Sequence, residues 1–207
     1  MNYLRNTLLL LSFVFSISLS AKDTPNSRQA RRIFNEVYEK TFGNEGSTLH
    51  YAVNIIGIFK TEGTIWYKNK KSKFVDERYN SFCDGTTYWL VERKKQTVHI
   101  HDAQSEKRDK YATKFVFYPE NFIYSIKDMS SHFELTLKAK PHTKGIKLVR
   151  VLLDKRTHNP LSLRVKLGII WTTVKISNYK CGGISESIFD FPKDKYKNYK
   201  VIDHRLE

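Results

Sequence analysis

Several features that mark common classes of protein are absent from this sequence of 207 residues. It contains no G-x-S-x-G elbow, no Cys-His nucleophile signature, no glycine-rich phosphate loop and no H-E-x-x-H metal motif. Internal repeats, low-complexity tracts and a break that would mark a second domain are missing as well. The sequence therefore gives no support to an enzyme, and we expect neither a catalytic residue nor a cofactor.

Cysteine is scarce, because Cys83 and Cys181 are the only two in the chain. In an oxidising compartment, a disulfide between them would close a loop of about 100 residues and stabilise the fold by roughly 4 to 5 kcal/mol. A disulfide also requires the two Cα atoms to lie within about 7 Å of each other, which the sequence does not reveal. A disulfide and two free thiols therefore both stay open.

Acidic residues are outnumbered, with 21 Asp and Glu against 36 Lys and Arg, and the formal net charge is +15. Such an excess of positive charge can bind nucleic acid or anionic lipid. It can also keep a β-rich surface soluble and protect the edges of its sheet. The basic residues are spread along the chain and form no cluster in the sequence. This distribution favours a solvated, lysine-coated sheet, and we expect no nucleic-acid partner.

Residues 1–20 have the three parts of a secretory signal peptide: Arg5 near the start, an apolar run from Leu8 to Leu19, and small residues at Ser18 and Ser20. The apolar run is too short to cross a bilayer, which takes about 20 residues in a helix. We therefore expect residues 1–20 to be removed on export and residues 21–207 to form a single exported domain.

One amphipathic helix is predicted at the start of that domain. Thr24-Pro25 has the pattern of an N-cap followed by a residue preset for the first helical turn. Apolar residues then recur at helical spacing as far as Phe42, and Gly43 ends the pattern.

From Thr48 onward, β-branched and aromatic residues alternate with short polar turns, which is typical of antiparallel hairpins. Strands are expected at residues 48–60, 63–68, 73–81, 86–92, 97–102, 132–138, 147–154, 161–167 and 169–179. The apolar segment Phe115–Tyr124, interrupted by Pro119 and Asn121, is predicted to be a lid. A sheet of about ten strands tends to curl. The predicted fold class is therefore mainly β, an incomplete (half-open) antiparallel barrel covered by the N-terminal helix and the lid.

Large rings at adjacent positions of one strand point to opposite faces of its sheet. Two such pairs occur, Trp66-Tyr67 and Tyr88-Trp89, the second just after an Asp-Gly turn at residues 84–85. Rings on both faces are explained if one face carries a lipid-sized groove and the other is covered.

His99 and His101 share one face of a predicted strand, as two ligands of a metal ion could. No third ligand follows at a metal-binding spacing. We therefore expect surface histidines and no metal.

Taken in order, three parts of the chain resemble the LolA-type periplasmic carriers of outer-membrane lipoproteins. Residues 63–68, Gly-Thr-Ile-Trp-Tyr-Lys closing on Phe74, are similar to an early hairpin of that family. Residues 84–89, Asp-Gly-Thr-Thr-Tyr-Trp, are similar to its Asp-Gly-x-x-x-Trp strand. Residues 189–191, Phe-Asp-Phe, with residues 201–205, Val-Ile-Asp-His-Arg, are similar to its C-terminal signature. The resemblance extends over nearly all of the exported domain.

The resemblance implies a periplasmic protein with a half-open barrel around a hydrophobic cavity. Such carriers accept lipoprotein acyl chains from an inner-membrane ABC transporter and pass them to an outer-membrane acceptor; one that works alone is expected to be a monomer. Where the best-known members carry an Arg that holds the lid shut, this chain has Asn69, beside Lys70 and Lys71. Lid closure and cargo therefore stay open. A glycolipid, a phospholipid or a polyene lipid is an alternative cargo, and a lipoprotein-sensing interaction protein is an alternative function.

Large apolar side chains of the strands and the lid are predicted to line the ligand cavity, although strand alternation alone leaves two possible faces. The predicted ligand-binding residues are Trp66, Phe74, Trp89, Phe117, Phe122, Leu152, Leu163 and Trp171. In the empty protein, Phe115, Phe117, Phe122 and Ile123 are predicted to fill the cavity and to swing away when cargo enters.

Overall fold

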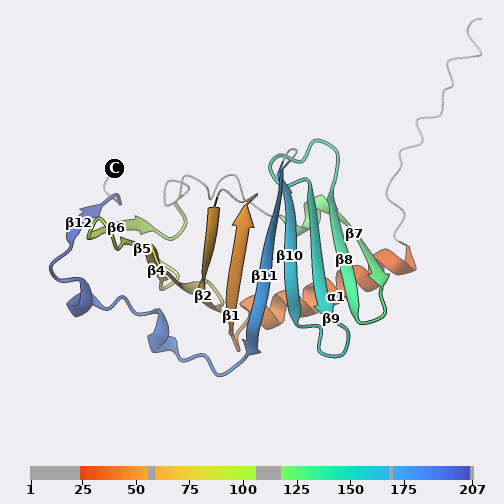
Figure 1. Cartoon of the computed structure of the whole chain (residues 1–207), viewed down its shortest axis with the longest axis horizontal. Helices are drawn as coiled ribbons and strands as arrows, with labels where there is room; N and C mark the ends of the chain where they lie inside the picture. Colours follow the sequence, from red (N-terminus) through yellow and green to blue (C-terminus); the bar gives the residue numbers. More distant parts are fainter. Residues whose placement is uncertain (1–23, 56–58, 106–117, 168–169, 206–207) are drawn as a thin grey trace, which may run out of the picture.

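The described part of the protein is organised around one sheet of 12 strands (Figure 1), in the order β12-β6-β5-β4-β3-β2-β1-β11-β10-β9-β8-β7. The computed structural model describes residues 24–55, 59–105, 118–167 and 170–205, so the predicted signal peptide lies outside the described residues. The strands are β1 (Ser47–Ile55), β2 (Phe59–Lys68), β3 (Lys71–Asp76), β4 (Tyr79–Cys83), β5 (Thr87–Glu92), β6 (Thr97–Asp102), β7 (Phe122–Asp128), β8 (His132–Ala139), β9 (Leu148–Asp154), β10 (Pro160–Leu167), β11 (Ile170–Cys181) and β12 (Lys200–Asp203).

The sheet is open and almost entirely antiparallel, which confirms the predicted mainly β fold class. β7 and β12 are its two edges. Strands β1 to β6 follow one another in one direction, and the chain then starts again at the opposite edge with β7 and returns to β11, which pairs with β1. β12 is parallel to β6, and this last strand was not predicted from the sequence.

Two predicted strands were wrong because each contains a reversal of the chain. Residues 73–81 are divided between β3 and β4, and residues 48–60 between β1 and the start of β2. In the first case the carboxylate of Asp76 accepts hydrogen bonds from the backbone amides of Arg78 and Tyr79, at 2.7 and 2.6 Å. An aspartate that bonds to the amides two and three residues ahead holds a turn without Gly or Pro.

The helix α1 (Pro25–Phe42) begins and ends where the sequence predicted. The side chain of Thr24 accepts a hydrogen bond from the amide of Ser27, and the amide of Gly43 donates to the carbonyl of Glu39. Among the described residues, no helix combines the length and the apolar character needed to cross a membrane.

α1 covers one face of the sheet at the β7 to β10 end, passing behind these strands in Figure 1. Ala30 and Ile33 of the helix pack on buried side chains of β7, β8 and β9, among them Leu135 and Leu153, which are 1% and 0% exposed. The rings of Phe34 and Tyr124 lie 5.2 Å apart. This helix-on-sheet contact is the larger apolar core of the protein.

The opposite face is covered at the other end of the sheet by the C-terminal segment, residues 184–199. This segment contains the short helices η4 (Glu186–Phe189) and η5 (Lys193–Tyr196). Phe191 and Tyr196 pack on Phe82, Val91 and other side chains of β4, β5 and β6. The segment is held to the β2–β3 hairpin by Glu186, which pairs with Lys68 at 3.0 Å and with Lys71 at 2.7 Å.

The prediction that Phe115–Tyr124 forms a lid was wrong for its described part. Pro119–Asn121 form the short helix η3, and Phe122 begins the edge strand β7. Phe122 is 3% exposed in the core beneath α1, whereas Ile123 points to the other side of the sheet and is 37% exposed. Phe115 and Phe117 lie outside the described residues.

The two cysteines are both free thiols. Cys83 lies on β4 and Cys181 on β11, with β3, β2 and β1 between them. Four steps between neighbouring strands amount to about 19 Å. This is far more than a disulfide can bridge.

Candidate functional site

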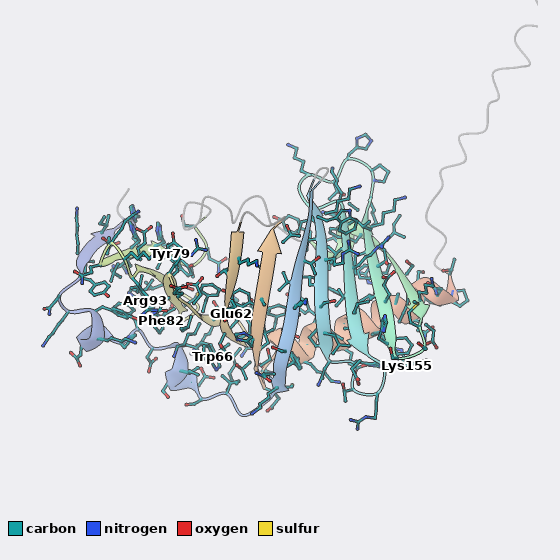
Figure 2. The ribbon with its side chains drawn as sticks, in the orientation of Figure 1. Glu62, Trp66, Tyr79, Phe82, Arg93 and Lys155 are labelled. Atoms are coloured by element: carbon teal, nitrogen blue, oxygen red, sulfur yellow. The ribbon has the colours of Figure 1, made fainter. Side chains whose placement is uncertain are left out.

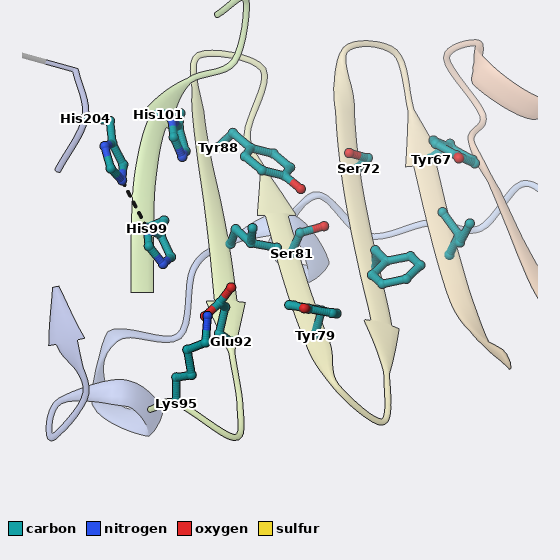
Figure 3. A pocket seen from close by; sticks show the side chains of 13 residues that line it. Tyr67, Ser72, Tyr79, Ser81, Tyr88, Glu92, Lys95, His99, His101 and His204 are labelled. Carbon is teal, nitrogen blue, oxygen red and sulfur yellow. Dashed lines mark hydrogen bonds and ion pairs between the residues drawn. The ribbon is translucent and has the colours of Figure 1, made fainter. Parts of the chain in front are cut away.

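A groove of about 770 Å³ lies on the face of the sheet that carries α1, beyond the C-terminal end of the helix (Figure 3). Its floor is one row of directly paired residues on neighbouring strands, Ile65 opposite Phe74, then Ser81, then Leu90. The rings of Tyr67, Tyr79 and Tyr88 stand on either side of this row. The volume falls within the range of small-molecule sites, about 300 to 1,000 Å³.

The floor differs from the rest of the same face in its exposure. Beneath α1, Leu135, Leu137 and Leu153 are at most 1% exposed. In the groove, Ile65, Phe74 and Leu90 are only half-buried, although they lie in the middle of the sheet. A contiguous apolar surface left open to solvent marks a site for an apolar partner.

α1 and the groove meet at Tyr67. The ring of Phe42, at the end of the helix, packs edge-on against the ring of Tyr67 at 4.7 Å. Desolvation raises the pKa of Tyr67 to about 12, so that its hydroxyl stays protonated and neutral. This boundary of the groove therefore offers aromatic carbon and uncharged hydroxyl groups.

Three histidines close the other end of the groove, as Figure 3 shows. His99 Nδ1 and His204 Nε2 are 3.0 Å apart, and the rings of His101 and His204 stack at 4.5 Å. His101 is 8% exposed, so the prediction of surface histidines was wrong for His101, whereas His99 is partly exposed. The reason is that the C-terminal chain after β12 places His204 over β6. The described residues contain no cluster arranged to hold a metal ion.

The rim near the histidines also carries an ion pair. Lys95 Nζ lies 2.8 Å from Glu92 Oε2, and both residues border the groove. The groove is thus apolar along its floor and charged or polar at its rim. Such a surface suits an amphiphile, whose chain lies on the floor while its polar group meets the rim.

The two faces of β5 explain the predicted pair of rings. Tyr88 lines the groove, whereas Trp89 points to the opposite face and stacks on Phe191, with ring centroids 5.3 Å apart and an angle of 7° between the planes. On the same opposite face, Lys73 lies over the rings of Trp66 and Phe82, two residues labelled in Figure 2. One face therefore carries a groove while the other is covered.

The eight predicted cavity residues are divided between the two faces. Phe74 lines the groove, and Phe122 and Leu163 belong to the core beneath α1 or pack against it. Trp66, Trp89, Leu152 and Trp171 point to the opposite face, and Phe117 lies outside the described residues. The part of these residues in ligand binding stays a prediction.

Sequence reasoning missed most of the groove, including Ile65, Leu90 and the three tyrosines. A usable signal was present, because Ile65 and Tyr67 alternate with Trp66, and Tyr88 and Leu90 alternate with Trp89. The predicted set followed the tryptophans and so selected the other face. Which face of the sheet meets the ligand depends on the segment that packs on the other face, and strand alternation does not identify that segment.

Asn69, where the resembled family carries an Arg, serves the β2–β3 turn. Its φ is +53°, a left-handed conformation that Asn adopts more easily than most residues. Its amide donates to the carbonyl of Gly43 at 3.3 Å, which connects the turn to the end of α1. The residue is exposed and shapes the hairpin beside the groove.

Comparison with known proteins finds relatives by structure alone: no family model matches the chain, and no curated protein matches it. An uncharacterized conserved protein from Thermus thermophilus matches with a TM-score of 0.59 at 10% identity, over 85% of this chain and 99% of that one. MucB matches with a TM-score of 0.51 at 12% identity, over 81% of this chain and 64% of MucB. The chain has the fold of these proteins.

A LolA superfamily protein from Nitrosomonas europaea also stands among the structural neighbours. Its TM-score is 0.40 at 9% identity, over 78% of this chain and 97% of that one. The assignment of the fold rests on the two stronger matches. Identities this low show the fold alone.

Proposed function

We propose that the protein is an exported carrier that binds the acyl chains of a lipoprotein, or of another lipid, in the groove between β2 and β6. The observation that carries the proposal is the half-buried row of Ile65, Phe74 and Leu90, which lies on the same face of the sheet as α1 but beyond the core that α1 covers. The resemblance of residues 63–68 and 84–89 to the LolA-type carriers is consistent with it, since both stretches contribute to the groove.

The openness of the groove suits a carrier that must release its cargo. Each buried CH₂ contributes about 0.8 kcal/mol, so that complete enclosure of several chains would make binding nearly irreversible. A groove with one open side leaves part of each chain in contact with solvent or with the next protein. Partial burial keeps the exchange of cargo reversible.

Export, location and partners belong to the same proposal. The sequence pattern of residues 1–20 supports export to the periplasm, where the carrier would work as a monomer. It would take acylated cargo from an inner-membrane ABC-type complex and deliver it to an outer-membrane acceptor. A glycolipid, a phospholipid or a polyene lipid would use the same groove, and the chemistry of its rim would select among them.

A binding titration with a matched pair of variants tests the proposal. The probes are a fluorescent long-chain fatty acid and a synthetic triacylated lipopeptide, added to the exported domain. Leu90→Asp places a charge on the groove floor, whereas Leu161→Asp places one on an exposed position of β10, which β1 and β11 separate from the groove. We expect Leu90→Asp to weaken binding at least about tenfold, because a carboxylate cannot share an apolar surface with an acyl chain.

Leu161→Asp should bind both probes like the unmodified protein, provided that circular dichroism shows both variants to be folded. Equal affinity in the two variants would refute the groove as the binding site. Competition by unlabelled phospholipid or glycolipid that is stronger than competition by the lipopeptide would keep the groove and change the cargo.

A further inference from the structure

Among the described residues, no segment packs on the face of the sheet opposite α1 over β8, β9, β10, β11 and β1. α1 packs on the other face of these strands, and the C-terminal segment packs on this face only at β4, β5 and β6. Figure 1 shows the broad side of these strands turned to the viewer, with α1 behind them. Side chains that alternate with the core residues therefore meet solvent here.

Apolar and cationic side chains alternate across the middle of this open face. The row of directly paired residues runs Ile123, Lys138, Leu148, Lys166 and Trp171, from the edge strand β7 to β11. We call this row, together with Arg150 and Arg164 of the next row, the basic face. Ile123 is 37% exposed, and Trp171 is half-buried among cations.

Trp171 is the centre of the basic face. The guanidinium carbons of Arg164 and Arg150 lie 5.0 and 5.6 Å from the centre of its ring, and Lys166 Nζ lies 5.9 Å from it. Three cations around one indole hold the ring in place and keep it at the surface. Long cationic side chains can bury their methylene groups against an apolar ring in this way.

These charges have no acidic partners in the described part of the chain. The two rows that form the basic face contain four cations and no acidic residue, and none of the four makes an ion pair with a described residue. Arg150 and Arg164 stand directly opposite each other, an arrangement of like charges that destabilises a sheet. Arg150 Nε is buried without a hydrogen-bond partner among the described residues.

We propose that the basic face is a docking surface for an anionic phospholipid membrane. The face is broad and carries cations spaced over three strands, so it fits an array of phosphates better than one small anion. Trp171, Leu148 and Ile123 between the cations fit the boundary of headgroups and acyl chains, where amphipathic rings accumulate. The net charge of +15 adds a general attraction to the same surface.

The proposal is independent of the cargo of the groove. The groove opens on the α1 side of the sheet, and the basic face is on the other side. A protein docked by the basic face keeps its groove free for a protein partner. Cargo binding and membrane binding are therefore separable by mutation.

Flotation with lipid vesicles tests the docking surface. The exported domain is mixed with vesicles of phosphatidylcholine alone, or of phosphatidylcholine and phosphatidylglycerol in equal parts, at low and at physiological salt. The variant Arg150→Gln, Arg164→Gln, Lys166→Gln removes three charges from the basic face. The control Arg28→Gln, Arg32→Gln, Lys94→Gln removes three exposed charges from α1 and the β5–β6 turn.

We expect binding to the anionic vesicles alone, weakened by salt, and reduced roughly 100-fold in the basic-face variant. The control should lose at most a few-fold. Equal losses in the two variants would show that only net charge matters and would overturn the docking surface. Binding to phosphatidylcholine alone, or to neither kind of vesicle, would overturn it as well.

The emission of Trp171 gives a second measurement that separates membranes from other polyanions. In the variant Trp66→Phe, Trp89→Phe, Trp171 is the remaining tryptophan. Anionic vesicles should shift its emission to the blue, and lipids brominated on their chains should quench it. Tight binding of RNA or heparin, without shift or quenching on vesicles, would instead assign the basic face to a polyanion in solution.

Discussion

Single residues decide how the sheet presents its two faces. Tyr88 and Trp89 are adjacent in the chain, but one lines the groove and the other stacks on Phe191. Strand alternation predicted that both faces would carry a ring, and the structure confirms it. Which ring meets the ligand could not be predicted, because Phe191 comes from a segment about a hundred residues away in sequence.

Asp84 fixes the turn that presents these rings, and its removal should destabilise the fold. Its carboxylate accepts hydrogen bonds from the amides of Thr86 and Thr87, both at 2.8 Å. Desolvation opposes ionisation, but the bonds from Thr87 and Thr86 hold the pKa of Asp84 below its usual value. We expect Asp84→Ala to lower the free energy of unfolding by about 1 to 2 kcal/mol in urea denaturation. Asp84→Asn keeps an acceptor oxygen and should lose less; equal losses would assign the effect to charge instead of the turn.

Secondary-structure elements were predictable where local chemistry decides them. α1 was predicted from Thr24, Pro25 and Gly43, and most strands from their alternation. The predictions failed where a distant partner decides: Phe122 was assigned to a lid, although α1 makes it part of an edge strand with a buried face. β12 was missed because its four residues gain their place only by pairing with β6.

The pairing of β12 with β6 should weaken in mild acid. Burial lowers the pKa of His99 from its usual value near 6.5; Glu92 opposes this effect, whereas His204 and Lys95 add to it. The folded state therefore holds the neutral ring, which supports the contact of His99 with His204. The stability that depends on the neutral ring is present above pH 6.5 and is lost as the pH falls toward the lower pKa of the folded state.

Amide exchange of β12 and urea denaturation at about pH 8 and about pH 5 measure this effect. The unmodified protein should lose stability and β12 protection at the lower pH. His99→Gln cannot be protonated and should show a smaller difference between the two conditions. An unchanged difference in the variant would contradict the assignment to His99.

At the scale of the whole molecule, two covers lie on opposite faces and at opposite ends of one sheet. α1 covers one face over β7 to β10, and the C-terminal segment covers the other over β4 to β6. In the described part of the chain, each cover leaves the remaining part of its own face open: the groove on one side and the basic face on the other. The sequence predicted a mainly β protein with a helix and an apolar cavity, but it could not show this arrangement.

The basic face shows why this arrangement could not be predicted from the sequence. Its residues are spread between positions 123 and 171, so the basic ones look dispersed in the sequence. Pairing of β7 through β11 brings them into two adjacent rows. Patterns along the chain identify strands, but the surface that strands build together follows from their order.

Native mass spectrometry of the protein purified from the cells that produce it tests the central claim, that the groove carries acyl chains. The unmodified protein should retain an added mass that, once released, contains fatty acyl groups, and Leu90→Asp should lose it while Leu161→Asp keeps it. A triacylated peptide would identify a lipoprotein carrier, and another acylated lipid would identify a lipid carrier of the same fold. An empty protein, or a bound species retained equally by Leu90→Asp, would contradict the account.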